Sequence, residues 1–380
     1  MSDERASAAV ERPTGLRFWK LLESRLVTGL VREPVFDFYA STLSPGFTAR
    51  RIRARVESTR DEARGVKSFV LRPNGHFRGF RPGQHVNLTV EIDGVRHTRC
   101  YSPSNAPDGT RAVVLTVKRH PGGKVSGWLH DRLRPGDWVE LGPARGDFVA
   151  PSNPRDKLLL IAGGSGITPV ASMLRDLSAR DLAHDIAVLV YGRTRSDLIF
   201  ADELRALARR HPGVRITFAV TRASAASGEL MGRFSAAHLD HVAPDAGERR
   251  IFVCGPPALI EGVRGLLKER GVTAPLQAET FAPIEPLTAD GDETVPAVQV
   301  TAARSAQTFA ANAASSLLVQ AERAGLSPAS GCRQGICFSC SCRKRSGVVR
   351  NISSGAISSE PDEDIRLCVS IPLSDVTLDL

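Results

Sequence analysis

A cluster of cysteines near the C-terminal end limits what this chain can fold into more than any other feature. The chain has seven cysteines in 380 residues, and four of them, Cys332, Cys337, Cys340 and Cys342, fall within eleven positions. The N-terminus is charged and has no apolar core followed by a cleavage site, so the sequence does not predict secretion. We therefore expect the clustered thiols to bind a metal and not to form disulfides.

The spacing of these cysteines points to one kind of metal centre. Cys332, Cys337 and Cys340 follow the pattern C-x4-C-x2-C, and Cys368 comes after 27 intervening residues. This is the plant-type ferredoxin pattern for a [2Fe–2S] cluster, which we predict to take three ligands from one tight loop and the fourth from a distant strand. Structural zinc is the alternative, although zinc sites prefer paired C-x2-C knuckles and only one is present. Cys342 is predicted to be a small buried residue beside the loop.

Composition describes an ordinary globular protein of several domains. At about 100–200 residues per domain, the length allows two to four domains. Hydrophobic residues make up 42% and charged residues 24%, which excludes wholesale disorder. No apolar run approaches the ~18 residues of a membrane helix. The net charge is +9, from 50 Lys and Arg against 41 Asp and Glu. Because there is no basic stripe with interleaved aromatic residues, we expect no nucleic-acid partner.

Hydrophobic patterning divides the chain into parts of different class. Six short strands and one helix between Gly/Pro turns predict a small antiparallel β-barrel over residues 48–152. Apolar strands alternating with helices predict a parallel α/β sheet over residues 153–284, which would bind ligands at the carboxyl ends of its strands. A polar linker is predicted at 285–296, and strands with one helix and the cysteine loop at 297–380.

Residues 1–47 form an N-terminal extension. Apolar residues recur at three- and four-residue steps over Leu16–Phe38, which predicts an amphipathic helix. The helix either packs on its own domain or docks on a membrane surface or a membrane-bound partner. We therefore expect a cytoplasmic protein, with peripheral contact at the inner face of the membrane as the alternative that the extension raises.

The barrel region carries a motif suited to a flavin dinucleotide. Such a ligand needs a flat face for the isoalloxazine, a hydrogen bond near N5, and positive charge with free N–H groups for the pyrophosphate. Tyr101, Ser102 and Arg99 can supply one each, and a glycine turn opening a helix offers backbone donors. A strand tyrosine is also a common packing residue. The predicted flavin residues are His85, Arg99, Tyr101, Ser102, Gly122, Gly123, Lys124, Val125 and Ser126.

The parallel-sheet region begins with an apolar strand, a glycine-rich turn and a helix start. Such a turn lets the backbone approach a pyrophosphate at the helix N-terminus, although the sequence is not G-x-G-x-x-G and a plain tight turn is the alternative. At the end of a later strand, a small soft thiol is placed to line a nicotinamide pocket, unless it is simply a buried apolar residue. The predicted nucleotide residues are Gly163, Gly164, Gly166, Thr168, Cys254, Gly255 and Pro256.

Two arginines follow the next strand of this region and bear on the choice of nucleotide. An acid commonly binds the ribose 2′-OH of NAD, whereas an arginine accommodates the 2′-phosphate of NADP. Arg193 and Arg195 favour NADPH over NADH, Asp197 argues for NADH, and Arg222 after the following strand is a further phosphate candidate or a solvated surface arginine.

Taken in order, these motifs resemble the ferredoxin–NADP reductase superfamily, and more narrowly its single-chain reductases with a C-terminal plant-type ferredoxin. The resemblance covers about residues 48–380. It implies a multidomain protein with an antiparallel flavin barrel, an α/β NAD(P) domain and a β-grasp ferredoxin domain. It further implies that Arg99 binds flavin phosphate, that Tyr101 and Ser102 contact the isoalloxazine, that Thr168 and Cys254 lie near the nicotinamide, and that Phe281 lies near the flavin. Tyr101, Ser102 and Cys254 are the predicted catalytic residues, and the motifs look more like FAD-containing members than FMN-containing ones.

The expected activity is the conversion of a two-electron donor into a one-electron donor. NADPH delivers a hydride, an iron–sulfur cluster accepts one electron at a time, and a flavin does both. The extension is similar to that of reductases that serve membrane-bound acyl desaturases, so a desaturase is the expected acceptor. The alternative acceptors are an aromatic-ring oxygenase, an epoxidase or a cytochrome P450. Two alternatives outside this class are a redox-sensing regulatory protein and a zinc-stapled binding module.

Overall fold

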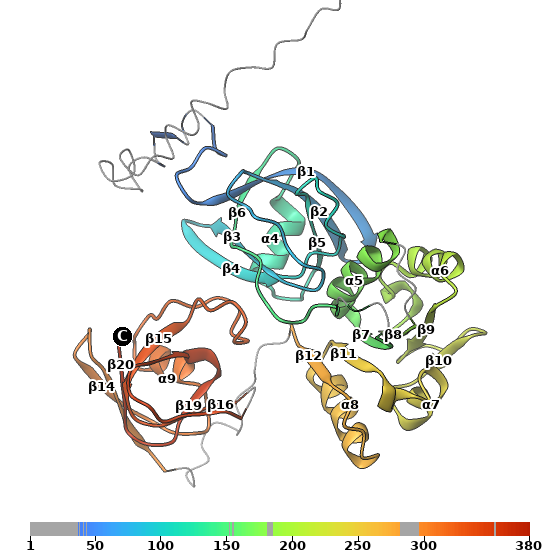
Figure 1. The fold of residues 1–380 in the computed structure, drawn as a ribbon. Coiled ribbons are helices and arrows are strands. Elements are labelled where there is room, and N and C mark those ends of the chain that lie inside the picture. Colours follow the sequence, from blue (N-terminus) through green and yellow to red (C-terminus); the bar gives the residue numbers. More distant parts are fainter. Residues whose placement is uncertain are drawn as a thin grey trace, which may run out of the picture.

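The structure, a computed structural model, describes residues 37, 39–40, 42, 44–151, 153, 156–180, 185–281, 296–352 and 355–380. The predicted amphipathic helix lies almost entirely outside these residues, as does nearly all of the predicted linker. The described chain folds into three parts in sequence order, coloured blue to blue-green, green to orange, and orange to red in Figure 1. Within the described residues, no helix combines the length and the apolar character that crossing a membrane requires.

The first part is the predicted antiparallel barrel. Its six strands pair in the order β4-β3-β6-β1-β2-β5, and an isolated bridge between Pro103 and Leu115 joins the two ends of the sheet. Apolar side chains from all six strands and from the helix form one core, because alternate strand residues point inward. The elements are β1 (Ile52–Ala63), β2 (Val66–Pro73), β3 (Val86–Ile92), β4 (Val95–Tyr101), β5 (Val113–Lys118), α4 (Lys124–Arg132) and β6 (Trp138–Leu141).

The second part is the predicted parallel sheet. Its strands pair in the order β10-β9-β8-β7-β11-β12, with every pair parallel. The strands are β7 (Leu158–Gly163), β8 (Ile186–Gly192), β9 (Val214–Val220), β10 (Glu229–Met231), β11 (Arg250–Cys254) and β12 (Leu276–Glu279), and the helices are α5 (Ile167–Ala179), α6 (Ala201–Arg210), α7 (Ala236–Val242) and α8 (Pro257–Glu269).

Helices cover both faces of this parallel sheet. One core joins alternate strand residues to α5 and α6, and a second joins the intervening strand residues to α7 and α8. The strands β7 and β8 are buried along their whole length, as expected for a sheet covered on both sides. The sequence pattern predicted four of the six strands and three of the four helices.

The third part has the mixed topology expected of a β-grasp domain. A five-stranded sheet has the order β14-β13-β20-β15-β18, beside a three-stranded sheet β17-β16-β19. Its elements are β13 (Val298–Ala302), β14 (Gln307–Ala311), α9 (Leu317–Arg323), β15 (Ser341–Ser346), β16 (Val349–Asn351), β17 (Ile357–Ser358), β18 (Glu363–Arg366), β19 (Ser370–Pro372) and β20 (Val376–Leu378). The three sheets of six, six and five strands lie inside the predicted domain ranges, and the exact boundaries stay a prediction.

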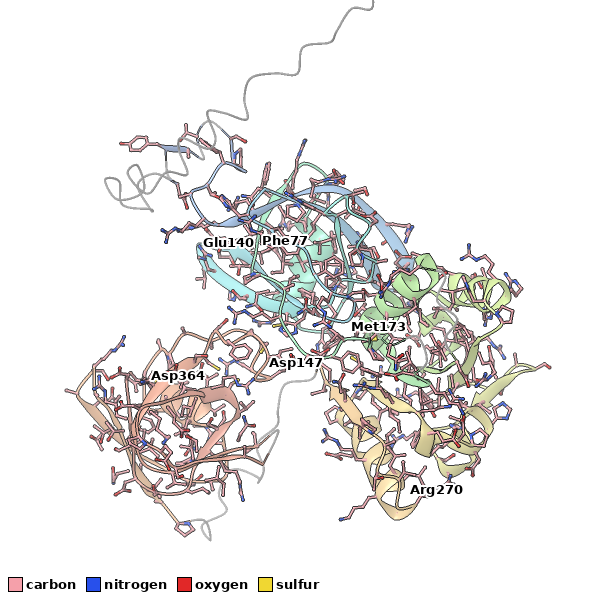
Figure 2. All side chains as sticks on the ribbon, in the orientation of Figure 1. Phe77, Glu140, Asp147, Met173, Arg270 and Asp364 are labelled. Atoms are coloured by element: carbon pink, nitrogen blue, oxygen red, sulfur yellow. The ribbon has the colours of Figure 1, made fainter. Side chains whose placement is uncertain are left out.

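The barrel and the parallel sheet meet through apolar side chains. Phe148 packs edge-on against Phe252 with ring centroids 5.4 Å apart, and Val66 and Phe148 belong to the same core as α5. Gly83 lies close to Met173, because a Cβ atom added to Gly83 would come within 2.5 Å of the Cε atom of Met173. The label on Met173 in Figure 2 lies where α5 meets the barrel.

Candidate functional site

The loop that carries the first three predicted cluster ligands is closed by backbone hydrogen bonds to sulfur. The N–H of Cys332 donates to Sγ of Cys337, and the N–H of Gln334 donates to Sγ of Cys332, both at 3.3 Å. The N–H of Gly335 donates to Sγ of Cys368 at 3.2 Å. Such bonds stabilise thiolates and tune a cluster. Backbone N–H groups of this loop are therefore aimed at the sulfurs of the predicted ligands.

The four predicted ligands lie together and form two close pairs. The sulfurs of Cys332 and Cys337 lie within 4.8 Å of each other, and a hydrogen bond from Cys368 lowers the pKa of Cys340 to about 7. Hydrogen bonds from neighbouring thiols also lower the pKa of Cys337, while the pKa of the other member of each pair, Cys332 and Cys368, is raised. Two pairs of thiols fit a centre with two irons, which would bind all four cysteines as thiolates. Cys368 stands in a short 3₁₀ turn, Leu367–Val369, and not in the strand that the sequence suggested.

Glycine makes the close wrapping of this loop possible. A Cβ on Gly331 would come within 2.9 Å of Sγ of Cys337. Gly335 has φ +77°, and a Cβ there would come within 2.7 Å of Val369. Cys342 is buried beside the loop on β15, and burial raises its pKa to about 11. It is a small buried thiol, as predicted.

The barrel places Tyr101 and Ser102 at the end of β4. Ser102 is 2% exposed, and its Oγ has no hydrogen-bond partner among the described residues. A buried hydroxyl without a partner is costly, so this atom fits a polar group of a bound flavin. Tyr101 packs on the barrel core, and burial raises its pKa, which keeps the phenol neutral.

The predicted phosphate turn opens α4 as expected. Gly122 has φ +70°, and Gly123 at the N-cap supplies no side-chain cap, so the first N–H groups of the helix are left for a ligand. Val125 is buried in the barrel core and offers only its backbone. The hydroxyl of Ser126 is 3.1 Å from the N–H of His120, from which it accepts a hydrogen bond. The Lys124 ammonium lies 4.0 Å from Asp93 at an exposed position.

His85 and Arg99 lie at the cluster loop, an arrangement that local sequence did not predict. Nε2 of His85 donates to the carbonyl of Ile336 at 3.0 Å, and its Nδ1 is 3.5 Å from a carboxylate oxygen of Glu279. Arg99 donates to the carbonyl of Gly331 at 3.3 Å. Both side chains therefore connect the barrel to the cluster-binding domain.

In the parallel sheet, the two predicted turns cross in direct backbone contact. A Cβ on Gly166 would come within 2.1 Å of the Cys254 carbonyl, and one on Gly163 would come within 2.8 Å of Pro256. Gly164 has φ +58°. The glycines thus bring the turn after β7 against the turn after β11. This crossing lies at the carboxyl edge of the sheet, where such folds bind nucleotides.

Thr168 and Cys254 are both buried next to this crossing. Thr168 Oγ1 donates to the carbonyl of Ser165 at 3.1 Å. Cys254 is fully buried, and burial, followed by the nearby Glu279 charge, raises its pKa well above the ordinary thiol value. The Cys254 thiol therefore stays protonated at neutral pH, which suits packing against a ligand and does not suit a general base. Phe281 follows β12 and packs on the core that holds Cys254.

The residues predicted to read the nucleotide fall into two groups. Nε of Arg195 is 2.9 Å from Glu229, and Asp197 accepts a bond from the N–H of Thr194 and lies 3.7 Å from Lys118. These two side chains are already engaged within the protein. The N–H of Arg222, in contrast, donates to the carbonyl of Arg193 at 2.9 Å, which places these two arginines on adjacent strand ends.

Three family models match the three parts of the chain. They are an oxidoreductase FAD-binding domain over residues 53–149, an oxidoreductase NAD-binding domain over 160–265, and a 2Fe-2S iron-sulfur cluster binding domain over 300–373. With the paired thiols and the flavin and nucleotide turns described above, they define an NAD(P)H oxidoreductase that uses FAD and a [2Fe–2S] cluster. This sets aside both the zinc-stapled module and the purely regulatory protein.

Similar proteins identify the family more closely. The chain is 33% identical to an NADPH oxidoreductase of Mycobacterium tuberculosis over 98% of this chain and 95% of the relative. It is 32% identical to the glycine betaine monooxygenase reductase subunit of Chromohalobacter salexigens over 90% and 99%. The structure of phthalate dioxygenase reductase matches with a TM-score of 0.58 and 26% identity, over 87% of this chain and 98% of the other. The chain therefore belongs to the ferredoxin–NADP reductase superfamily, among its reductases with a C-terminal [2Fe–2S] domain.

Proposed function

We propose that this reductase passes electrons from NADPH through FAD and the [2Fe–2S] cluster to an oxygen-activating partner protein. The supporting observation is that the candidate flavin domain contacts the nucleotide domain on one side and the cluster loop on the other. The nucleotide turns share an apolar core with the barrel, and the cluster loop bonds to barrel strands β3 and β4. Bound FAD supplies the chemistry of accepting a hydride and releasing single electrons.

In this proposal the chain's own residues bind and orient the cofactors. Tyr101 stacks on the isoalloxazine and Ser102 donates its free hydroxyl to it. The N–H groups at the start of α4 hold the pyrophosphate of FAD. The crossing of Gly166 and Cys254 would form the floor of the nicotinamide site, with the neutral thiol buried at this floor. Contact distances of about 3–3.5 Å between reacting atoms are required for hydride transfer, and the shared core supports that precision.

The proposed preference for NADPH over NADH rests on Arg193 and Arg222, whose side chains have no partner among the described residues. Asp197 is held by Thr194, so its carboxylate is not free for a ribose 2′-OH, while Arg193 and Arg222 stand on adjacent strand ends. A relative named NADPH oxidoreductase agrees with this choice. Replacing both arginines with alanine should lower kcat/KM for NADPH by about 10- to 100-fold, as expected for lost hydrogen bonds to a charged group, and leave that for NADH nearly unchanged. An equal loss with both nucleotides would contradict the assignment. Arg209→Ala, on α6, is the control.

Two classes of acceptor are candidates. An oxygenase is favoured by relatives named as reductase subunits of glycine betaine monooxygenase and stachydrine N-demethylase. A membrane-bound acyl desaturase is the finer candidate from the sequence, and the alignment with the mycobacterial relative covers 98% of the chain, including most of the N-terminal extension. In the second case the extension would bring a cytoplasmic enzyme to the inner face of the membrane.

One reconstitution tests the whole proposal. Anaerobic holoprotein is mixed with NADPH or NADH while flavin and cluster absorbance are followed, and then with a desaturase in vesicles or a soluble ring oxygenase. We expect bleaching of both chromophores and turnover with one acceptor class. Deleting residues 1–36 should reduce turnover only with the vesicle-bound acceptor. Failure of both nucleotides to bleach the flavin would overturn the proposed function.

A further inference from the structure

Two barrel side chains that are not among the predicted cofactor-binding residues lie against the cluster ligands. Asn87 on β3 and Cys100 on β4 are directly opposite each other in the antiparallel register. Residues in such a pair share one face of a sheet. The thiol of Cys100 donates to Oδ1 of Asn87 at 2.9 Å, and Nδ2 of Asn87 donates to the carbonyl of Cys337 at 3.2 Å. The amide thus joins the flavin strand to a cluster ligand.

Cys100 also comes close to the cluster sulfurs themselves. Its Sγ lies with those of Cys332 and Cys337 in a group whose atoms are all within 4.8 Å of one another. The two irons are already provided with four thiols by the pattern described above, so Cys100 is not needed as a ligand. A small polarisable thiol at this position permits the loop to approach β4 closely. The next residue along β4 is Tyr101, which the proposed function puts at the flavin.

The Asn87–Cys100 pair is held in place by the barrel. The N–H of Gly142 donates to the carbonyl of Asn87 at 2.8 Å, and a Cβ on Gly142 would come within 3.1 Å of the Cβ of Asn87. The flanking donors His85 and Arg99 also bond to loop carbonyls. The barrel therefore presents three side-chain donors to the backbone of the cluster loop, His85, Asn87 and Arg99.

We propose that Asn87 and Cys100 are positioning residues that hold the cluster against the flavin strand for electron transfer. This inference rests on the proposed function. Each NADPH is oxidised to NADP⁺ with release of one proton and two electrons, and the cluster receives these electrons singly, with no bond formed or broken at Asn87 or Cys100. The pair acts on the flavin-to-cluster step and not on hydride transfer.

Stopped-flow absorbance of the full-length holoenzyme separates the two steps. In Asn87→Ala, we expect NADPH to bleach the flavin at the wild-type rate and the cluster to be reduced about 10-fold more slowly, the lower end of effects at residues that support metal ligands. Cys100→Ser keeps a donor to Asn87 and should retain most of the rate, whereas Cys100→Ala should lose part of it. Thr89→Ala is the matched control, because Thr89 bonds Thr98 at 2.7 Å on the same sheet face one pair further along.

A second measurement reports docking without turnover. Hydrogen–deuterium exchange of the peptide around residues 331–338 should be faster in Asn87→Ala than in the wild type or in Thr89→Ala, at equal cluster content by absorbance. If Asn87→Ala with a full cluster reduces it at the wild-type rate, or if its flavin bleaching slows equally, the positioning role is wrong. If the wild type does not bleach with either nucleotide, the proposed function fails instead.

Discussion

The barrel's contacts with its two neighbouring domains differ in one respect: among the described residues, only the contact with the parallel sheet includes a shared apolar core, in addition to polar bonds such as the one from Oγ of Ser172 to the carbonyl of Asn105. Toward the parallel sheet it contributes Val66 and Phe148 to a common apolar core. Toward the cluster domain it offers polar donors, with Asn87 and His85 bonding to the carbonyls of Cys337 and Ile336. Apolar burial stabilises roughly in proportion to area, whereas a single hydrogen bond contributes about 0.5–1.5 kcal/mol net.

This difference matches the two kinds of transfer. A hydride moves only between atoms in near contact, so a shared core that fixes two domains as one body suits the nucleotide side. An electron does not require atomic contact between donor and acceptor, so a smaller polar contact suffices on the cluster side. We therefore expect substitutions on the first side to affect folding and hydride transfer together, and those on the second side to affect electron transfer alone.

Removal of one cluster ligand should break the cluster side completely. In Cys368→Ser we expect loss of the cluster absorbance and of NADPH-dependent reduction of cytochrome c, since a hydroxyl is a poor replacement for a thiolate. NADPH should still bleach the flavin and reduce ferricyanide. Cys342→Ser is the matched control, because this thiol is buried in the same domain and is not a predicted ligand. A Cys368→Ser protein with a full cluster would contradict the ligand assignment.

The apolar contact on the other side should be the next most sensitive. Phe148→Ala should cost about 3–5 kcal/mol of stability and also slow flavin bleaching by NADPH, because the ring packs against Phe252 of the parallel sheet. Phe77→Ala is the control: this ring is fully buried inside the barrel alone and should destabilise without changing the bleaching rate of folded protein. Equal bleaching rates in both variants would show that the shared core does not set the hydride geometry.

The sequence pattern was sufficient for the regular elements and insufficient for short edge elements. Buried strands and amphipathic helices have strong periodicity. The sequence predicts a strand over residues 186–191 and a helix over residues 201–210, and the structure has β8 at Ile186–Gly192 and α6 at Ala201–Arg210. The strand β10 (Glu229–Met231), the helix α7 (Ala236–Val242) and the strand β12 (Leu276–Glu279) were missed. Each is short, and β10 and β12 form only because a sheet edge is present to pair with them.

The site was predictable where chemistry is local and not where it depends on docking. The spacing of the cluster cysteines and the glycine turns carry their own signal in the sequence. The bond from Asn87 to the carbonyl of Cys337 joins residues 250 positions apart, and a backbone carbonyl leaves no mark in a sequence. For the same reason, Arg99 was assigned only to flavin phosphate, and its bond to the carbonyl of Gly331 was not foreseen.

Acid should weaken the parallel sheet by protonating the carboxylates that are paired with buried Arg249. A hydrogen bond from buried Arg249 is the main cause of the lowered pKa of Asp245, and Arg249 also lowers that of Asp185 against the effect of burial. A carboxyl with a lowered folded pKa adds stability above its unfolded pKa of about 3.9. That stability is lost as the pH falls through the folded value.

Calorimetry of Arg249→Lys checks this effect. Loss of the paired guanidinium bonds to Asp245 and Asp185 should lower Tm by roughly 2–6 °C at pH 7. The difference in Tm between the variant and the wild type should disappear as the pH falls below about 3.9. Arg119→Lys is the control, because Arg119 forms the same kind of fork with Asp131 at an exposed position. An unchanged difference in Tm at pH 3 would mean that these two carboxylates do not contribute to the stability of the folded protein.

The smallest effect is expected at the rim of the cluster contact. The Phe338 ring follows a predicted ligand and lies between Arg145 of the barrel, 5.5 Å from its centroid, and Arg366 of its own domain, 4.8 Å away. An exposed cation–π contact contributes about 0.5–1 kcal/mol, which corresponds to a factor of about 2 to 5. Arg145→Gln should therefore slow flavin-to-cluster transfer by about this factor at unchanged cluster content, while Arg366→Gln should disturb the loop itself, since Arg366 also donates to the carbonyl of Gly335. If Arg145→Gln slowed the transfer as much as Asn87→Ala, the arginine contacts with Phe338, and not the amide of Asn87, would hold the cluster domain. The contact would then weaken with added salt.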